Sequence, residues 1–257
     1  MIFPKAHTPQ FKIVNGINLA YTEAGIPGKP ALIFIHGLAE NRQTWDKNLD
    51  GLHTDFHCFA MDLPGHGLSQ SGDYRYTPYF FAETIIEFIK LLQLEEVKLI
   101  GHSLGGQIAV IMGISNPALI SKLILISPAG FEIFNHHDTR WLINHSKNYI
   151  DTSFSSFLPG FKNAMPSGTV YKATIAGMLN QPVFEHLHLI TQPVLVIFGE
   201  EDPFIPNRFL HPDLTPAMIA ENGASEIPDS KLILLKGVGH FVHVEQARKV
   251  NEEIGRF

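Results

Sequence analysis

Short, largely apolar runs recur along the chain and are separated by longer, more polar stretches. They cover residues 31–35, 56–61, 97–100, 122–126, 193–198 and 232–235. A short run without regular polar alternation is typical of a parallel strand that is buried on both faces. Six such runs, with helical segments between several of them, predict an α/β fold with a mostly parallel, doubly wound sheet.

Three further segments have clear local signals. Apolar residues recur at helical spacing over residues 77–92, which predicts an amphipathic helix, and residues 245–257 are expected to close the chain as a helix. Residues 11–14 and 17–21 flank Asn15-Gly16. Asn-Gly is the strongest short-range signal for a two-residue turn, so an antiparallel hairpin is expected ahead of the parallel strands.

The alternation of strands and helices breaks between residues 131 and 190. This segment is polar and aromatic by turns, contains Pro159-Gly160, and has no run that resembles a central strand. We interpret residues 131–190 as a mostly helical cap inserted into a core domain made of residues 1–130 and 191–257. Residues 207–230 are also longer than a minimal connection and are expected to carry a lid element.

Bulk properties narrow the class of protein. A chain of 257 residues suffices for one large α/β domain with an insertion. Its net charge of −6 gives no electrostatic reason to expect nucleic acid or an anionic membrane as a partner. With no run near the roughly 18 apolar residues of a membrane span, and no leader pattern in residues 1–5, a cytoplasmic protein acting on a small molecule is expected. The single cysteine, Cys58, is interpreted as a buried small hydrophobe, and the oligomeric state stays open.

The sequence Gly101-His102-Ser103-Leu104-Gly105 joins one apolar run to a helical segment. Gly-x-Ser-x-Gly between a strand and a helix is typical of a nucleophile elbow. In so tight a turn the serine has a strained backbone, and its neighbours two before and two after lie too close to other chain for a Cβ. Ser103 is therefore the candidate nucleophile. The alternative, a serine that only caps the helix, does not require the flanking glycines.

A serine hydroxyl needs an adjacent base, and the base needs a carboxylate that orients it. His240 follows the last predicted strand and is the candidate base, while Asp202 follows the strand before and is the candidate carboxylate. Glu200 and Glu201 are rivals of Asp202, interpreted as solvated loop charges. His243 is the rival base, but it lacks the glycine that precedes His240.

Five motifs at predicted strand ends resemble those of the α/β-hydrolase fold, in the order of that family. They are His36-Gly37, Asp62-x-Pro64-Gly65-x-Gly67-x-Ser69, Gly101-x-Ser103-x-Gly105, Gly199-x-x-Asp202-x-x-x-Pro206 and Gly239-His240. The resemblance covers nearly the whole chain except the cap, and the order Ser, Asp, His is the one expected for this fold. It implies a serine catalytic triad and no cofactor.

The resemblance also implies the other parts of the site. The backbone N–H groups of Leu38 and Leu104 are expected to form the oxyanion hole. The candidate pocket residues are His36, Gly37, His102, Phe131, Trp141 and Phe241. Of these, His36 and His102 are expected to form local hydrogen bonds without acting as bases, and Asp62 and Ser69 to have structural roles in the turn beside the site.

Several other groups are interpreted structurally. His136-His137-Asp138 and His186-x-His188 contain metal-binding residue types, but neither has a recognised metal spacing. We expect solvated cap residues there and assign no metal site. Trp45 and Arg42 are candidates for lining the pocket, but the favoured interpretation is a packing residue for Trp45 and a surface charge for Arg42.

The candidate groups suit acyl transfer. Ser103 would attack a carbonyl and form an acyl-enzyme, and water activated by His240 would release the acid. The aromatic and methionine content of residues 131–190, without a cluster of Arg or Lys, favours small, largely apolar carboxylic esters. Serine at the elbow disfavours haloalkane dehalogenases and epoxide hydrolases, which resemble this chain but use aspartate there.

Other functions share this fold. A serine-dependent C–C bond hydrolase acting on vinylogous diketone acids is favoured by Ser127-Pro128-Ala129-Gly130 leading into the cap, and disfavoured by the lack of tryptophan in residues 241–244. Thioesterases, acyltransferases and cofactor-free perhydrolases fit the same triad. A receptor that keeps the fold and binds a small ligand is the non-catalytic alternative, and the fold alone does not decide between them.

Overall fold

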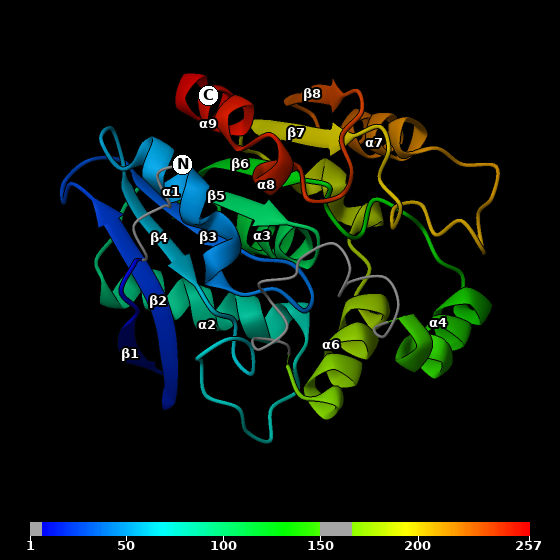
Figure 1. Ribbon diagram of the computed structural model, residues 1–257, viewed down its shortest axis with the longest axis horizontal. Coiled ribbons are helices and arrows are strands. Elements are labelled where there is room, and N and C mark those ends of the chain that lie inside the picture. The colour runs from blue at the N-terminus through cyan, green and yellow to red at the C-terminus, as the bar shows by residue number, and fades with distance from the viewer. Residues whose placement is uncertain (1–6, 150–165) are drawn as a thin grey trace.

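One eight-stranded sheet organises the molecule (Figure 1). The computed structural model describes residues 7–149 and 166–257. The strands follow the order β1-β2-β4-β3-β5-β6-β7-β8, with β1 and β2 antiparallel to their neighbours and all pairs from β4 to β8 parallel. Their bounds are β1 (Gln10–Val14), β2 (Ile17–Gly25), β3 (Ala31–Ile35), β4 (His57–Met61), β5 (Val97–His102), β6 (Ile120–Ile126), β7 (Val194–Gly199) and β8 (Ser230–Leu235). The predicted α/β class with a mostly parallel sheet is confirmed.

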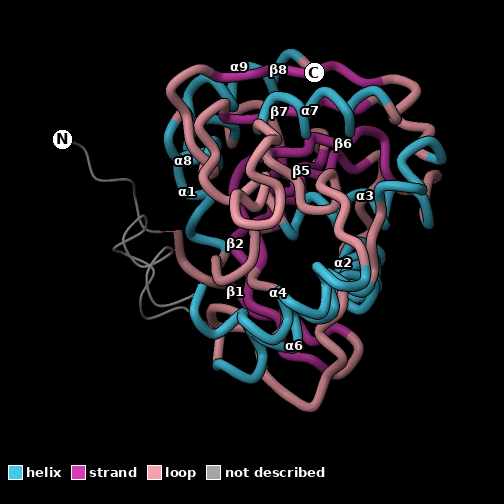
Figure 2. The backbone as a smooth tube through the Cα atoms, turned by 90° about the vertical axis from the view of Figure 1, so that its right-hand side faces the viewer, coloured by secondary structure: helices cyan, strands magenta, loops and turns pink. Residues whose placement is uncertain are grey.

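Helices cover both faces of the sheet (Figure 2). Side chains of α2, α3 and α7 join the apolar core on one face, and side chains of α1 and α9 join the core on the other. None of the helices in the described ranges combines the length and the apolar character needed to cross a membrane. The helical elements are η1 (Arg42–Trp45), α1 (Asp46–Leu52), α2 (Pro78–Leu91), α3 (Leu104–Ser115), α4 (His136–Tyr149), α6 (Gly168–Asn180), η4 (Phe184–Leu189), α7 (Pro216–Ser225), α8 (Val242–Glu245) and α9 (Ala247–Arg256).

The strand β3 explains why the central strands are continuously apolar. Successive side chains of a strand point to opposite faces. Ile33 and Ile35 accordingly pack into the core beneath α2 and α3, while Leu32 and Phe34 pack into the core beneath α1 and α9. Burying each such side chain stabilises the fold by about 1.5–3 kcal/mol. Because both faces are covered, a polar side chain at any position of β3 would be buried.

The N-terminal hairpin forms as its turn sequence predicts. Asn15 and Gly16 have positive φ angles of 49° and 80°, the conformation that a two-residue Asn-Gly turn requires. Val14 therefore pairs directly with Ile17. β2 continues to Gly25 and pairs with β4, which joins the hairpin to the parallel part of the sheet.

The segment between β6 and β7 contains α4, α6 and η4 in its described part. α4 packs on α6, and α6 also contacts α2. In Figure 1 the arrowheads of β5 and β7 point to the side of the molecule on which α4 and α6 lie. Residues 150–165, within the predicted cap, lie outside the described residues, and the cap boundaries at 131 and 190 stay predictions.

The C-terminal third contains helices beyond β7 that complete the core. α7 packs on β7 and β8, with Thr215 capping its N-terminus and Ile219 and Ala220 buried, and the lid element expected within residues 207–230 stays a prediction. The closing helix forms within two residues of its predicted bounds as α9, and Gln246, with φ −125° and ψ 39°, separates it from the short helix α8.

Arg42 is a buried ion-pair partner, so its interpretation as a surface charge was wrong. Asp62, at the end of β4, is fully buried, and a buried carboxylate must be paired and hydrogen-bonded. Its Oδ2 accepts from the Arg42 guanidinium at 2.6 Å and from the Leu68 backbone N–H at 2.8 Å, and its Oδ1 accepts from the Arg42 backbone N–H at 2.7 Å. Trp45 is fully buried, as predicted.

We predict that Phe131→Ala lowers the free energy of unfolding by about 3–5 kcal/mol, because a fully buried aromatic ring is lost. Phe131 is 0% exposed and stacks on Phe198 of β7, and a Cβ added at Gly223 of α7 would fall 2.1 Å from its ring. Urea unfolding measures the change. Phe11→Ala is the control: Phe11 is 51% exposed on β1, so a change of at most about 1 kcal/mol is expected. Equal effects of the two substitutions would contradict this placement.

Candidate active site

Ser103 lies on a strained turn between β5 and α3. Its φ of 51° and ψ of −117° are unfavourable for a residue with a side chain. A Cβ added at Gly101 would fall 2.2 Å from the carbonyl oxygen of Gly105, and one added at Gly105 would fall 2.2 Å from the carbonyl oxygen of Ile35. Only glycine permits these approaches, so both flanking glycines are required by the turn.

The hydroxyl of Ser103 does not cap α3. Ser103 stands at the N-cap position, but its side chain makes no capping hydrogen bond. Its backbone is held on the neighbouring strand instead: its N–H donates to the Ile126 carbonyl at 3.0 Å, and its carbonyl accepts from the Ala129 N–H at 2.9 Å. The interpretation of Ser103 as a mere helix cap is thereby removed, and the side chain lines a cavity.

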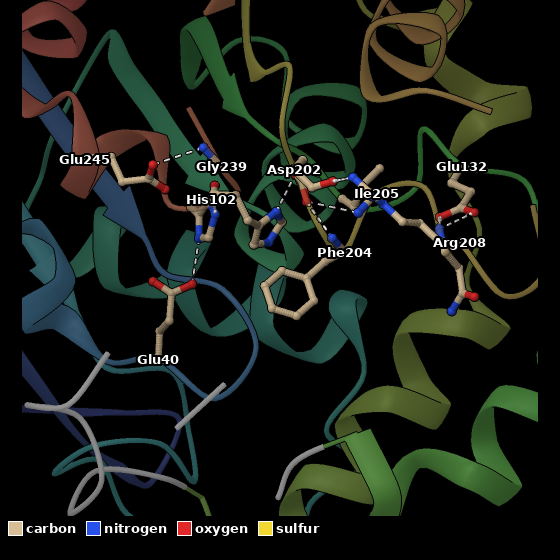
Figure 3. Close-up of polar contacts among 11 residues, drawn as sticks. Glu40, His102, Glu132, Asp202, Phe204, Ile205, Arg208, Gly239 and Glu245 are labelled. Carbon is tan, nitrogen blue, oxygen red and sulfur yellow. Dashed lines mark hydrogen bonds and ion pairs between the residues drawn. The ribbon is translucent and has the colours of Figure 1, made fainter. Parts of the chain in front are cut away.

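Asp202 and His240 follow the ends of β7 and β8 and come together there. Figure 3 shows Asp202 beside Phe204 and Ile205. His240 Nδ1 lies 2.6 Å from Asp202 Oδ2, and both side chains are buried. The other carboxylate oxygen of Asp202 accepts from the backbone N–H groups of Phe204 at 2.8 Å and Ile205 at 3.0 Å. These three hydrogen bonds fix the carboxylate, and the carboxylate in turn fixes the tautomer of the imidazole.

The pairing shifts both groups toward their charged forms. Burial disfavours the imidazolium of His240, but the charge of Asp202 and the hydrogen bond to it outweigh burial and raise the pKa of His240 above its ordinary value. Burial likewise disfavours the carboxylate of Asp202, but His240 and the two backbone donors outweigh it and lower the pKa of Asp202. The site therefore stabilises a protonated His240.

The three rival residues are placed elsewhere. Glu201 is exposed and Glu200 is half-buried, whereas the fully buried Asp202 is hydrogen-bonded to His240. His243 is fully buried, with Nε2 at 2.8 Å from the Thr44 hydroxyl and its ring 4.2 Å from that of Trp45. Burial lowers the pKa of His243 to about 4, so this ring is neutral and structural.

The two candidate oxyanion donors lie on either side of Ser103. Leu104 is the first residue of α3, where a helix leaves backbone N–H groups without intrahelical partners. Leu38, in the loop after β3, lines the same cavity as Ser103. A Cβ added at Gly37 would fall 3.1 Å from the Cβ of Ser103, so glycine lets this loop approach the serine. His36 steadies the loop: its Nδ1–H donates to the Gly37 carbonyl at 2.8 Å, and its Nε2 accepts from the Leu63 N–H at 3.0 Å.

The cavity beside Ser103 and His240 is mostly apolar. Its described wall includes one carboxylate, Glu132, and no lysine or arginine. The apolar part of the wall comes from the loop after β3, from the segment between β6 and β7, and from the loop after β7: Leu38, Ala129, Phe134, Leu142, Tyr171, Ile175, Met178, Leu179, Pro182, Phe204 and Ile205.

The six predicted pocket residues are not part of this wall as far as the described residues define it. Phe131 lies in the core beneath α7, Phe241 is 3% exposed beside Phe204, and Trp141 stacks on Phe209 with ring centroids 4.7 Å apart. His36, Gly37 and His102 lie behind the serine. These residues were chosen for nearness to motifs in the sequence, which does not fix the direction of a side chain.

The wall residues that the sequence analysis missed include Gln107 and Glu132. Gln107 lies one helical turn after Ser103, so helical spacing could have placed it on the same face. Its Nε2 donates to the carbonyls of Met178 at 3.0 Å and Gln181 at 2.7 Å, which joins α3 to the C-terminal end of α6. Glu132 had no local signal, because its partners are far along the chain: the Asn207 N–H at 2.9 Å and His211 Nδ1 at 2.6 Å.

The candidate metal motifs do not assemble a ligand set. Asp138 and the backbone of His137 bond to Asn135 at the start of α4. Among the described residues, a different set of three side chains brings potential metal-ligand atoms within 4.8 Å of one another. These side chains are Glu40, His102 and His243, and all three are buried.

The chain belongs to the alpha/beta hydrolase family, because the model of that family matches residues 32–253. It is 27% identical to the uncharacterized hydrolase YugF of Bacillus subtilis, over 95% of each chain. Among solved structures, an esterase from Thermogutta terrifontis matches with a TM-score of 0.79 at 20% identity, covering 97% of both chains. The enol-lactonase of Burkholderia xenovorans LB400 matches with a TM-score of 0.80 at 17% identity, covering 96% of this chain and 98% of the other. Hydrolase activity is supported by this membership.

We predict that an NMR titration finds the pKa of His240 above its ordinary value of about 6.5. In Asp202→Asn the attraction is lost while burial remains, so the pKa of His240 should fall below that value. Glu201→Gln, an exposed change on the same loop, is the control and should leave the titration unchanged. A pKa of His240 that does not respond to Asp202→Asn would contradict the pairing.

Proposed function

We propose that this protein is a serine hydrolase that cleaves small, neutral carboxylic esters through an acyl-enzyme on Ser103. The observation that carries the proposal is the 2.6 Å pair of His240 and Asp202 beside a cavity lined by both His240 and Ser103, with Ser103 on a strained turn. Family membership supports the reaction class. Two structures with the same fold are named as an esterase and an enol-lactonase, and a lactone is a cyclic ester.

In the proposed reaction, His240 Nε2 removes the proton of the Ser103 hydroxyl as its oxygen attacks the ester carbonyl. The backbone N–H groups of Leu38 and Leu104 stabilise the negative oxygen of the tetrahedral intermediate, and His240 returns the proton to the departing alcohol. Water then attacks the acyl-enzyme, losing its proton to His240. The proton passes to Ser103 as the acid leaves. The Asp202 carboxylate stabilises the imidazolium in both steps.

The wall of the cavity favours a neutral substrate. Its described part is apolar apart from a few polar groups, includes no lysine or arginine, and includes the carboxylate of Glu132, which lies 2.6 Å from His211. An anionic substrate would meet the like charge of this carboxylate. This observation favours ester hydrolysis over the alternative C–C hydrolase, because vinylogous diketone acids carry a carboxylate.

We predict that Ser103→Ala lowers kcat for p-nitrophenyl butyrate by about 10⁴- to 10⁶-fold, because the nucleophile is lost while the fold is kept. The same substitution should abolish labelling by a fluorophosphonate probe. Ser71→Ala, which changes an exposed serine, is the control and should keep the original turnover. Full esterase turnover in Ser103→Ala would refute the proposed function, and a parent protein that is neither labelled nor active would favour the receptor.

We further predict that kcat/KM for p-nitrophenyl butyrate exceeds that for the p-nitrophenyl monoester of succinic acid by at least about tenfold, or about 1.4 kcal/mol. The two acyl chains have equal length and differ in the terminal carboxylate. Glu132→Gln should narrow this ratio, because the like charge is removed. Both kcat/KM values in the ratio are measured on the same variant, so a smaller amount of folded protein does not change the ratio. Faster turnover of the anionic ester would contradict the assignment of the substrate class.

A further inference from the structure

Three buried ionisable side chains behind His240 have no part in the proposed reaction. Glu40 is 1% exposed, and His102 and His243 are 0% exposed. Burying ionisable groups costs free energy unless they are paired. The ring of His102 also lies 4.6 Å from that of His240, measured between centroids. This cluster therefore touches the candidate base from the side opposite the cavity.

The imidazole of His102 connects Glu40 to the backbone of His240. Its Nδ1 lies 2.6 Å from Glu40 Oε1, and its Nε2 lies 3.0 Å from the carbonyl oxygen of His240 (Figure 3 shows the contact with Glu40). A carbonyl oxygen only accepts, so Nε2 carries a proton. Burial raises the pKa of Glu40, but its contacts with His102 and His243 outweigh burial and hold this pKa well below its usual range. The ring of His102 is thus held between the Glu40 carboxylate and the His240 carbonyl.

A shared metal ion does not account for the contact. Two ligand atoms about 2.0–2.1 Å from a tetrahedral ion lie about 3.3 Å apart. The 2.6 Å between His102 Nδ1 and Glu40 Oε1 is instead the length of a short, charge-assisted hydrogen bond.

The loop that carries His240 is held at three points. Asp202 holds the imidazole, Glu245 Oε2 accepts from the Gly239 N–H at 2.9 Å, and His102 holds the carbonyl of His240 itself. Of these three contacts, only the hydrogen bond from His102 comes from the residue that directly precedes Ser103. It therefore fixes the backbone of the base relative to the backbone of the nucleophile.

We propose that His102, held by Glu40, is a positioning residue that sets the place of the His240 imidazole relative to Ser103. The proposal rests on the proposed serine-hydrolase function. In this proposal, His102 and Glu40 act through His240 and do not touch the substrate. Losing it should slow the chemical step and leave substrate binding nearly unchanged, because a misplacement of about 1 Å can cost about 100-fold in rate.

Two substitutions of His102 separate its contacts. Glutamine can present an amide N–H near the place of Nε2 and keep the bond to the His240 carbonyl, whereas asparagine reaches only the place of Nδ1. We predict that His102→Asn lowers kcat for p-nitrophenyl butyrate by about 10- to 100-fold with KM within about threefold, and that His102→Gln restores kcat to within about fivefold of the parent. Equal losses in both variants, no loss in either, or a loss confined to KM would overturn the proposal.

Glu40 gives an independent pair of variants. In Glu40→Gln the new amide can donate to Nδ1 of a neutral His102, whose Nε2–H still reaches the His240 carbonyl, so kcat should stay within about fivefold of the parent. In Glu40→Ala, Nδ1 loses its partner and kcat should fall as in His102→Asn. This pair decides the matter if His102→Asn does not fold, and equal kcat values in the two Glu40 variants would overturn the proposal.

His66→Gln controls for the loss of a buried histidine. His66 is 0% exposed and hydrogen-bonds to the Pro64 carbonyl at 3.2 Å, in a different loop. The His66→Gln variant should have a lower Tm than the parent protein, and its kcat should stay within about threefold of the parent value. Ser103→Ala is assayed in parallel. If it is inactive and the His102 and Glu40 variants break the expected pattern, only the positioning role is refuted, whereas full turnover in Ser103→Ala refutes the proposed function.

Discussion

The close approach of backbone to backbone around Ser103 is the constraint on which the candidate site depends. The turn brings the carbonyl of Gly105 near Gly101, and the carbonyl of Ile35 near Gly105, at distances that exclude a Cβ. In the loop after β3, a Cβ at residue 37 would crowd the side chains of Glu40, His102 and Ser103, so glycine eases the approach of this loop to the serine. The strain at Ser103 persists because parallel strands on both sides of β5 hold the turn in place.

Buried charge is handled in the same way throughout the molecule. Arg42 with Asp62, His240 with Asp202, and His102 with Glu40 are each paired at 2.6 Å. An unpaired partner in any of these places would leave a charge without solvent, which costs far more than a surface ion pair contributes. Each pair also joins segments that are distant in the sequence, so the charges that require pairing also fix the loops around the site.

Local patterns predicted the parts of the fold that depend on local physics. Asn15-Gly16 set the hairpin, and the apolar runs located the parallel strands, because burial on both faces leaves a direct trace in composition. The path of the chain across residues 207–230 could not be predicted, since α7 is defined by its packing on β7 and β8. Glu40 and Glu132 were missed for the same reason: their partners lie 62 and 79 residues away.

The amide of Gln107 has a mechanical consequence. Both of its N–H groups are taken up by carbonyls at the end of α6, and Gln107 itself is 1% exposed on the helix that begins directly after Ser103. Swinging α6 outward would strand an amide inside an apolar wall, which costs about 1–3 kcal/mol for each unsatisfied group. The part of the cavity wall formed by α6 is therefore fixed relative to Ser103. The width of the cavity on that side is set by the position of α3 on the sheet.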